Sequence, residues 1–207
     1  MEDTARLIKP ILCIVAGPNG SGKTTTTESL LQHQWASDSL YINPDNIAQE
    51  RFGGWNDPAS ILEAARYATS IRYDYLRDKR SFVFETVFSS EEKLQFLLKA
   101  KEAGYFVRLF FVCTDDPGIN AMRITARYLM GGHEVPISKI VSRYYKSIAN
   151  LIRSIPLADR IYVYDNTAEG KTPILLFRIS DGLIQRQYQP HIPTWATAIY
   201  EAATRQV

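Results

Sequence analysis

The sequence predicts an α/β fold in which helices cover both faces of a mainly parallel β-sheet, and three observations support this prediction. Five short apolar segments, typical of strands, alternate with stretches whose apolar residues recur at helical spacing. A glycine-rich loop, residues 17–24, joins the first of these strands to the first helix. Each of the four later strands is followed within three residues by a carboxylate, at the edge where such sheets bind ligands.

In the first half of the chain, each predicted element has its own local signal. Residues 11–16 are continuously apolar and rich in β-branched side chains, as expected of a strand that is buried on both faces. A helix follows the loop at residues 24–34, and a short strand at residues 39–42 ends at an asparagine and a proline. Residues 58–79 predict a helix with proline in its first turn, and residues 81–84 predict another buried strand.

The second half of the chain continues this alternation. A helix at residues 90–103 ends at a glycine, as helices commonly do, and an aromatic and β-branched strand follows at residues 105–113. Two helices, residues 118–130 and 137–154, are separated by a glycine pair. The fifth strand covers residues 160–164.

The end of the chain predicts an antiparallel addition to the sheet. Two strand-like runs within residues 173–188 are joined by an Asp-Gly turn, which is a hairpin signal, and a short helix is expected over residues 194–203. Residues 1–207 are therefore interpreted as a single domain whose core covers residues 10–167. A helical lid region is expected at about residues 116–154.

Length and composition limit the classes of protein to which the chain can belong. With 207 residues, of which 45% are hydrophobic and 22% charged, and a net charge of +2, it fits a soluble globular protein without an overall bias toward nucleic acid. No apolar run reaches the ~20 residues of a membrane span, so we expect a cytoplasmic protein without a membrane partner. Cys13 and Cys113 are expected in the core, and the scattered histidines do not suggest a zinc site.

The loop at residues 17–24 fits the pattern G-x-x-x-x-G-K-[ST], which binds the phosphates of a nucleoside triphosphate. Its backbone N–H groups and the positive end of the following helix converge on phosphate oxygens. Lys23 can reach the β- and γ-phosphates and the Thr24 hydroxyl can ligate Mg²⁺, so ATP and Mg²⁺ are the expected cofactors. The nucleotide-binding candidates in this loop are Gly17, Pro18, Asn19, Gly20, Ser21, Gly22, Lys23 and Thr24.

A kinase needs a carboxylate beside the phosphate acceptor, and the sequence lacks the Asn-Lys-x-Asp segment of a guanine-binding switch protein. Asp45 is the first candidate for the base that deprotonates the acceptor hydroxyl, because its strand end is expected beside the phosphate loop. Its alternative role is to cap the N-terminus of a helix. Glu85 and Thr86 end the most apolar strand, where Glu85 can bind acceptor hydroxyls or hold Mg²⁺ through water. The alternative for Glu85 is a solvated carboxylate at a strand exit.

A basic segment after the fourth strand can supply charge that closes over the phosphates. Arg123 and Arg127 are four residues apart and share one helix face, and Arg143 follows beyond the glycine pair. His133, next to that pair, is a candidate lid ligand or a loop cap. A lid that folds these side chains onto the nucleotide is one interpretation, and a solvated charged helix is the other.

The ordered set of these motifs resembles the zeta toxin family of small P-loop kinases, in particular a compact branch that carries Gly-Gly-His-x-Val-Pro. The resemblance covers about residues 10–167 and extends the nucleotide-binding loop to Thr25. It implies a three-layer P-loop kinase fold, with a mainly parallel five-stranded sheet that the C-terminal hairpin extends. The segments that carry it are residues 16–25, 41–45, 84–86, 127–136, 143–144 and 159–166.

The resemblance also implies an activity. Characterised zeta toxins transfer the γ-phosphate of ATP to the 3′-hydroxyl of the sugar in UDP-N-acetylglucosamine, and an antitoxin protein restrains them. By resemblance, Lys23 and Arg127 contact phosphate, Asp45 is the catalytic base, and Glu85 and Thr86 lie on the acceptor side.

One position departs from the larger toxins, which carry a second phosphate arginine where this chain has His133. Arg123 or Arg143 can supply that charge. A uridine diphosphate sugar is therefore the first acceptor that we expect, and a kinase of another hydroxyl, in a nucleoside, an antibiotic or an RNA end, is the alternative. A non-catalytic module whose bound ATP controls a partner is the third possibility. Apart from the RNA end, nucleic acid is not an expected partner.

Overall fold

The computed structural model describes residues 9–33, 36, 39–54, 57–131 and 135–204, in which strands and helices alternate as predicted. The strands are β1 (Ile11–Ala16), β2 (Leu40–Ile42), β3 (Phe82–Thr86), β4 (Phe106–Cys113), β5 (Arg160–Asp165), β6 (Ile174–Ser180) and β7 (Leu183–Gln187). The helices are α1 (Lys23–Leu31), α2 (Pro44–Arg51), α3 (Pro58–Arg77), α4 (Glu91–Glu102), α5 (Pro117–Leu129), α6 (Ile137–Ser154) and α7 (Thr194–Thr204), with a 3₁₀ turn, Ile155–Leu157, after α6. Of these helices, α2 was foreseen only through the alternative role of Asp45 as a helix cap.

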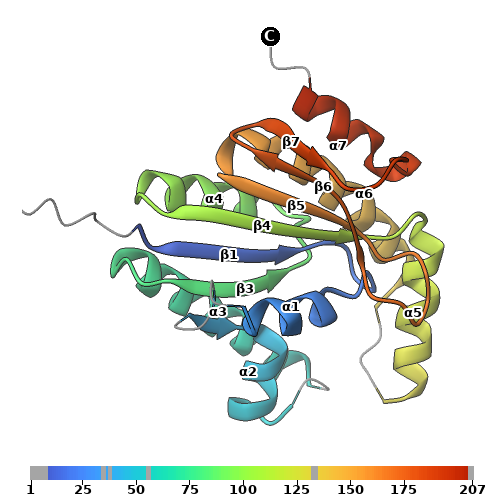
Figure 1. The fold of residues 1–207 in the computed structure, drawn as a ribbon. Helices are drawn as coiled ribbons and strands as arrows, with labels where there is room; N and C mark the ends of the chain where they lie inside the picture. Colours follow the sequence, from blue (N-terminus) through green and yellow to red (C-terminus); the bar gives the residue numbers. More distant parts are fainter. Residues whose placement is uncertain (1–8, 34–35, 37–38, 55–56, 132–134, 205–207) are drawn as a thin grey trace, which may run out of the picture.

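All seven strands form one sheet in the spatial order β2-β3-β1-β4-β5-β6-β7 (Figure 1). The strands β1 to β5 pair in parallel, and β6 and β7 add antiparallel at one edge. The predicted α/β fold with a C-terminal hairpin is therefore confirmed. One detail was wrong, because β3 lies between β2 and β1. The strand end beside the phosphate loop is thus that of Glu85, which pairs with Val15, and not that of Asp45.

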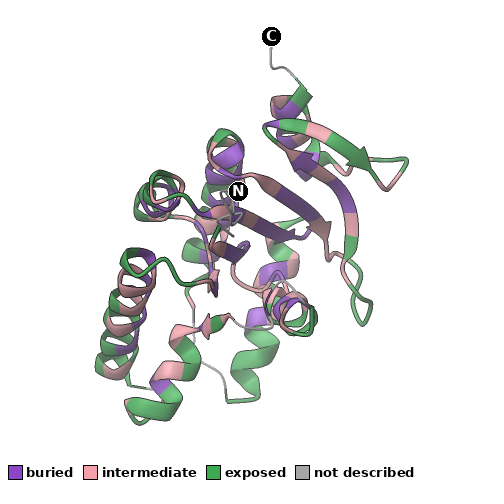
Figure 2. Cartoon of the chain, turned by 60° about the vertical axis from the view of Figure 1, so that its left-hand side comes forward, coloured by how far each residue is buried: buried purple, intermediate pink, exposed green. Residues whose placement is uncertain are grey.

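The core has two parts because successive residues of each central strand face opposite sides of the sheet. On one side, Leu12 and Ile14 pack into a large cluster with buried residues of α3, α4, α6 and α7. On the other side, Cys13 and Val15 pack with Leu30 of α1. Figure 2 shows buried residues concentrated in the strands and in the helix faces that meet them.

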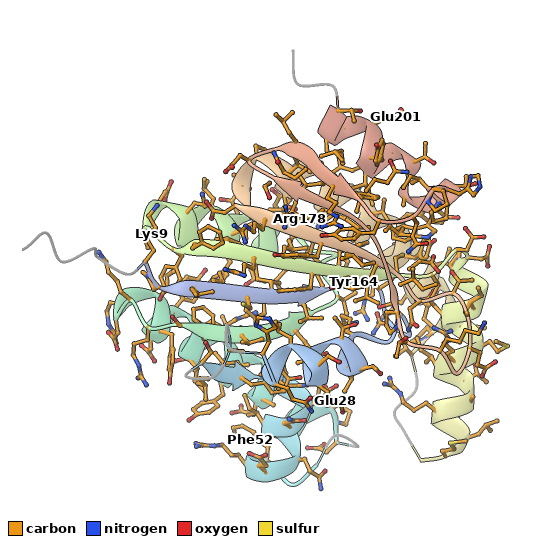
Figure 3. The ribbon with its side chains drawn as sticks, viewed as in Figure 1. Lys9, Glu28, Phe52, Tyr164, Arg178 and Glu201 are labelled. Atoms are coloured by element: carbon orange, nitrogen blue, oxygen red, sulfur yellow. The ribbon has the colours of Figure 1, made fainter. Side chains whose placement is uncertain are left out.

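Both cysteines lie in this core, as predicted, and neither is in a disulfide. Burial raises the pKa of each thiol, Cys13 and Cys113, to about 12, so both stay protonated near neutral pH. On the α1 side of the sheet, β5 and β6 carry the half-buried Tyr164 and Arg178 (Figure 3). No helix in the part of the chain that the structure describes is long and apolar enough to cross a membrane.

The phosphate loop is held in place by neighbouring elements on three sides. The Gly17 N–H donates to the Thr86 carbonyl at 3.2 Å, which ties the loop to the end of β3. The side-chain amide of Asn120 in α5 donates to the Asn19 carbonyl at 2.6 Å. The side-chain amide of Asn166, after β5, donates to the Ser21 carbonyl at 2.8 Å. The backbone of the loop is therefore fixed before any ligand arrives.

Packing around the loop makes its glycines necessary for steric reasons as well as conformational ones. Gly20 has a φ of +74°, and a Cβ atom built on it would lie 2.6 Å from the Asn120 carbonyl oxygen. Gly104 has a similar φ of +87° at the end of α4, but nothing lies within 4 Å of its Cβ position. The two positions share backbone strain and differ in packing.

We expect Gly20→Ala to destabilise the protein by about 3 kcal/mol, because the new methyl group forces the backbone of the loop away from α5. Gly104→Ala, the matched control, should cost only ~1 kcal/mol, which is the strain of a left-handed residue other than glycine. Urea denaturation of both variants measures the free energies of unfolding. Equal losses in the two variants would contradict the steric argument.

Candidate active site

A cleft of about 650 Å³ lies at the carboxyl ends of the parallel strands. The phosphate loop, the start of α2, one face of α3, the segment after β3, and parts of α5 and α6 line it. The predicted site residues that line this cleft are Asn19, Gly20, Gly22, Lys23, Thr24, Asp45, Glu85, Thr86, Arg123, Arg127 and Arg143. Thr25 instead lines a separate pocket of about 280 Å³ between α1 and β5. Gly17, Pro18 and Ser21 are buried parts of the loop, and His133 lies outside the described residues.

Lys23 begins α1 and keeps its ammonium group against the loop. Its Nζ donates to the Pro18 carbonyl at 3.0 Å. Burial lowers the pKa of Lys23 to about 8, and the positive charge of Arg127 contributes to this shift whereas the Glu85 carboxylate partly offsets it. An incoming phosphate would supply a counter-charge and so stabilise the buried ammonium. A site that binds a triphosphate requires a cation placed in this way.

Asp45 lies in the first turn of α2 with an exposed side chain. The cap of this helix is Asn43, whose Oδ1 accepts a hydrogen bond from the Asp45 N–H at 2.8 Å. The alternative interpretation of Asp45 as the N-cap was therefore wrong. Its carboxylate lines the cleft, where it is available to an acceptor.

Glu85 is half-buried near the end of β3 and is held by two side chains that the sequence analysis did not single out. Tyr41 donates its hydroxyl to Glu85 Oε1 at 2.7 Å, and Asn43 donates its side-chain amide to the Tyr41 oxygen at 2.8 Å. Burial, and then the Glu85 charge, raise the pKa of Tyr41, so the phenol stays a donor. Glu85 is thus an oriented carboxylate in the cleft and not a freely solvated one.

The segment after β3 forms a second wall of the cleft and is fixed by α6. Thr86 is buried, and its Oγ1 accepts from the Phe88 N–H at 3.1 Å. Ser147 donates its hydroxyl to the Val87 carbonyl at 2.5 Å. Asn150 donates its side-chain amide to the Phe88 carbonyl at 3.0 Å. This support holds Phe88 at a φ of +60°, which is rare for a residue other than glycine.

The three predicted arginines occupy different positions. Arg123 donates to the carbonyls of Asn166 and Thr167 at 2.9 and 3.2 Å, so it holds the segment after β5. Arg143 donates to Asn19 Oδ1 at 3.3 Å, which places it against the phosphate loop. Arg127 is exposed and lines the cleft. Arg127 and Arg143 are therefore the better placed of the three to clamp phosphate.

The predicted lid region divides into two unlike parts. The helix α6 packs into the core through buried residues along its length, including Ile140, Tyr144 and Leu151. The second half of α5 is exposed, with Leu129 and Met130 at 80% and 87% exposure. We expect any closing motion to be confined to the exposed second half of α5.

Two further cations line the cleft and were missed by the sequence analysis. Arg72 lies on the face of α3 that carries Thr69, and Lys93 lies in the first turn of α4. An arginine among the apolar residues that recur along a helix was the available signal for Arg72. Lys93 stands among exposed charged residues and offered no comparable signal.

The residues present fit a Mg²⁺ ion that is held together with nucleotide phosphates. Thr24 is exposed at the start of α1, and Glu85, whose Oε1 accepts from Tyr41, lines the same cleft. No cluster of three or more His, Cys, Asp or Glu side chains among the described residues can hold a metal by itself. Most ligands would therefore come from the nucleotide and water, as Mg²⁺ prefers.

Comparisons with known proteins identify similar sequences. A sequence profile described as zeta toxin matches residues 1–172. An uncharacterised protein of Haemophilus influenzae is 29% identical over 128 residues, which are 62% of this chain and 88% of that protein.

Two solved structures are similar in fold. One is from the PezAT chromosomal toxin-antitoxin system of Streptococcus pneumoniae, with a TM-score of 0.60, 14% identity, and 95% of this chain and 85% of that chain covered. The other is the AvrRxo1-ORF1:ORF2 complex with ATP, with a TM-score of 0.63, 18% identity, and 96% of this chain and 65% of that chain covered. At these identities the similarity concerns the fold alone.

The lowered pKa of Lys23 predicts that nucleotide binding weakens as the pH rises through about 8. Below this pH the free protein already carries the ammonium that the phosphates need. Above it, binding must first protonate Lys23, so affinity should fall by up to roughly tenfold per pH unit until the pKa of the complex is reached.

Calorimetric titration with a non-hydrolysable ATP analogue, from about pH 7 to about pH 9.5 at constant ionic strength, measures this slope. Lys23→Met provides the reference, because its weaker affinity should not vary over the same range. A wild-type profile as flat as that of the variant would show that Lys23 does not titrate there.

Proposed function

The chain belongs to the zeta toxin family, as the match over residues 1–172 establishes, and we propose that it phosphorylates a uridine diphosphate N-acetyl sugar. Family membership makes it an ATP-dependent P-loop kinase. Since characterised zeta toxins act on UDP-N-acetylglucosamine, this sugar nucleotide is the first acceptor that we propose.

A single cleft that brings the cations beside the phosphate loop together with two carboxylates carries the proposal. Lys23 and Arg143 contact the phosphate loop, whereas Asp45 comes from α2, the helix after β2, and Glu85 from β3. The volume of about 650 Å³ falls within the usual range for sites that bind small molecules. The cleft therefore suits a reaction between a bound triphosphate and a hydroxyl.

In the proposed reaction, the acceptor hydroxyl oxygen forms a bond to the γ-phosphorus as the bond from this phosphorus to the oxygen bridging it to the β-phosphate breaks. ADP leaves, and the hydroxyl proton moves to the Asp45 carboxylate. Lys23, Arg127 and Arg143 stabilise the negative charge that develops on the phosphate oxygens. Thr24, and Glu85 through water, would hold a Mg²⁺ ion, which would neutralise phosphate charge. Tyr41 keeps Glu85 oriented on the acceptor side.

We also propose that a separate antitoxin protein restrains this activity. The support is the family membership and the fold shared with a protein from the PezAT toxin-antitoxin system. The exposed apolar residues at the end of α5, Leu129 and Met130, follow Arg127 along the chain and offer a surface that such a protein can cover.

An assay with labelled ATP tests the acceptor. We expect label to appear on UDP-N-acetylglucosamine and not on nucleosides, aminoglycoside antibiotics or RNA with a 5′-hydroxyl. Label on a different member of this panel would show that the protein is a kinase but that its acceptor is not UDP-N-acetylglucosamine. Release of free phosphate alone, with no labelled acceptor, would overturn the proposed function.

Asp45→Asn should reduce phosphate transfer by roughly a hundred- to ten-thousandfold, because the acceptor hydroxyl loses its base. Affinity for a non-hydrolysable ATP analogue should stay within about twofold, since Asp45 lies on the acceptor side. Glu50→Gln changes an exposed carboxylate on the same helix, outside the cleft, and should leave both quantities unchanged. Undiminished transfer by Asp45→Asn would exclude Asp45 as the base.

A further inference from the structure

A second group of cations lines the cleft on the wall formed by α3 and the start of α4. Ala65, Thr69 and Arg72 recur at helical spacing along the face of α3 that meets the cleft. Ser90 and Lys93 belong to the adjoining start of α4. Since α3 packs beside α2 and β2, this wall is on the Asp45 side of the cleft.

Arg72 is a buried arginine whose hydrogen bonds are incomplete. It is 5% exposed, and its guanidinium lies 4.9 Å from the ring centre of Phe84 and 5.5 Å from that of Phe96. One terminal nitrogen donates to Thr69 Oγ1 at 2.8 Å and lies 3.6 Å from Glu92 Oε1. The buried Nε has no hydrogen-bond partner among the described residues. A guanidinium stays charged in proteins, so the Arg72 side chain carries an N–H group that lacks a hydrogen-bond acceptor.

Lys93 shares its counter-ion with Arg72. Its ammonium lies 2.6 Å from Glu92 Oε2, and its side chain is 19% exposed. Burial, and then the positive charge of Arg72, lower the pKa of Lys93. Two cations that line the cleft thus depend on a single carboxylate, and an excess positive charge remains.

A purely structural role for Arg72 fits these contacts less well. The cation–π contacts with Phe84 and Phe96 offset only part of the cost of burying the charge. An excess of buried charge beside a cleft is instead typical of a site that binds an anion. Arginine offers a planar fork that matches phosphate oxygens, and the Lys93 ammonium adds a point charge.

We propose that Arg72 and Lys93 bind a phosphate group that belongs to the acceptor, so that this enzyme selects phosphate-bearing acceptors over neutral or cationic ones. The inference rests on the proposed kinase function, because it assigns the acceptor side of that cleft. It excludes a free nucleoside and an aminoglycoside as preferred acceptors, since the first lacks the anion and the second adds positive charge.

Binding measurements test this inference without requiring turnover. The phosphate loop is first saturated with a non-hydrolysable ATP analogue and Mg²⁺, so that added phosphate compounds cannot occupy it. UDP-N-acetylglucosamine, N-acetylglucosamine 1-phosphate, inorganic phosphate and N-acetylglucosamine are then titrated separately. We expect Arg72→Met to weaken binding of the three phosphate compounds by about ten- to a hundredfold, and to leave N-acetylglucosamine unaffected.

Matched variants separate this effect from a loss of structure. Arg66→Met removes an exposed arginine from the same helix and should change none of the affinities. Arg72→Lys restores a charge and should recover part of the binding. Lys93→Met, at the less buried position, carries the test if Arg72→Met does not fold, and it should weaken the phosphate compounds in the same selective way. Unchanged affinity for the ATP analogue identifies the folded variants.

The two proposals can fail separately. Phosphate compounds that bind folded Arg72→Met and Lys93→Met as tightly as wild type would overturn the inference, even if the kinase acts on a panel member. Selective loss of binding in these variants, together with no labelled acceptor in the transfer assay, would support the anion site and overturn the proposed reaction.

Discussion

The close packing of the phosphate loop against its neighbours is the constraint on which the site depends. A Cβ atom at Gly17 would lie 2.0 Å from the Val112 carbonyl oxygen, and one at Gly22 would lie 2.1 Å from the Asn166 amide nitrogen. The loop therefore fits only because β1 is central and the ends of β4 and β5 close around it. The glycines of this motif are usually explained by the close approach of phosphate to the loop backbone. In this chain they are needed equally because the loop packs against the ends of β4 and β5.

Charge in the cleft follows a common principle on both sides. Lys23 on the donor side and Arg72 on the acceptor side are cations whose burial disfavours the charged form. Each has a partner that offsets only part of this cost, the Pro18 carbonyl for Lys23 and Glu92 for Arg72. Positions of this kind reduce stability in the free protein and gain favourable interactions when anions bind, which is a recurrent compromise at functional sites.

Local patterns were enough to predict the strands, the phosphate loop and the hairpin, because each is encoded by neighbours in the sequence. Strand order was not, since alternation along the chain does not say that β2 lies outside β3. Asp45 and Glu85 could be proposed because carboxylates at strand ends are conspicuous. Tyr41 could not, because its role depends on a contact with Glu85, 44 residues away. The buried setting of Arg72 likewise arises from rings that β3 and α4 bring to α3.

The helix α6 joins the two sides of the cleft through side chains at helical spacing on one face. Arg143 contacts the phosphate loop, whereas Ser147 and Asn150 hold the carbonyls of the segment after β3. Seven residues of α-helix span about 10 Å, so the separation of these contacts is set by a regular backbone and not by flexible loops. The helix α6 therefore sets the distance between the nucleotide side and the acceptor side of the cleft. Inserting one residue between Arg143 and Ser147 would rotate Ser147 and Asn150 by about 100° relative to Arg143. The helix could then no longer contact the phosphate loop and the segment after β3 at the same time.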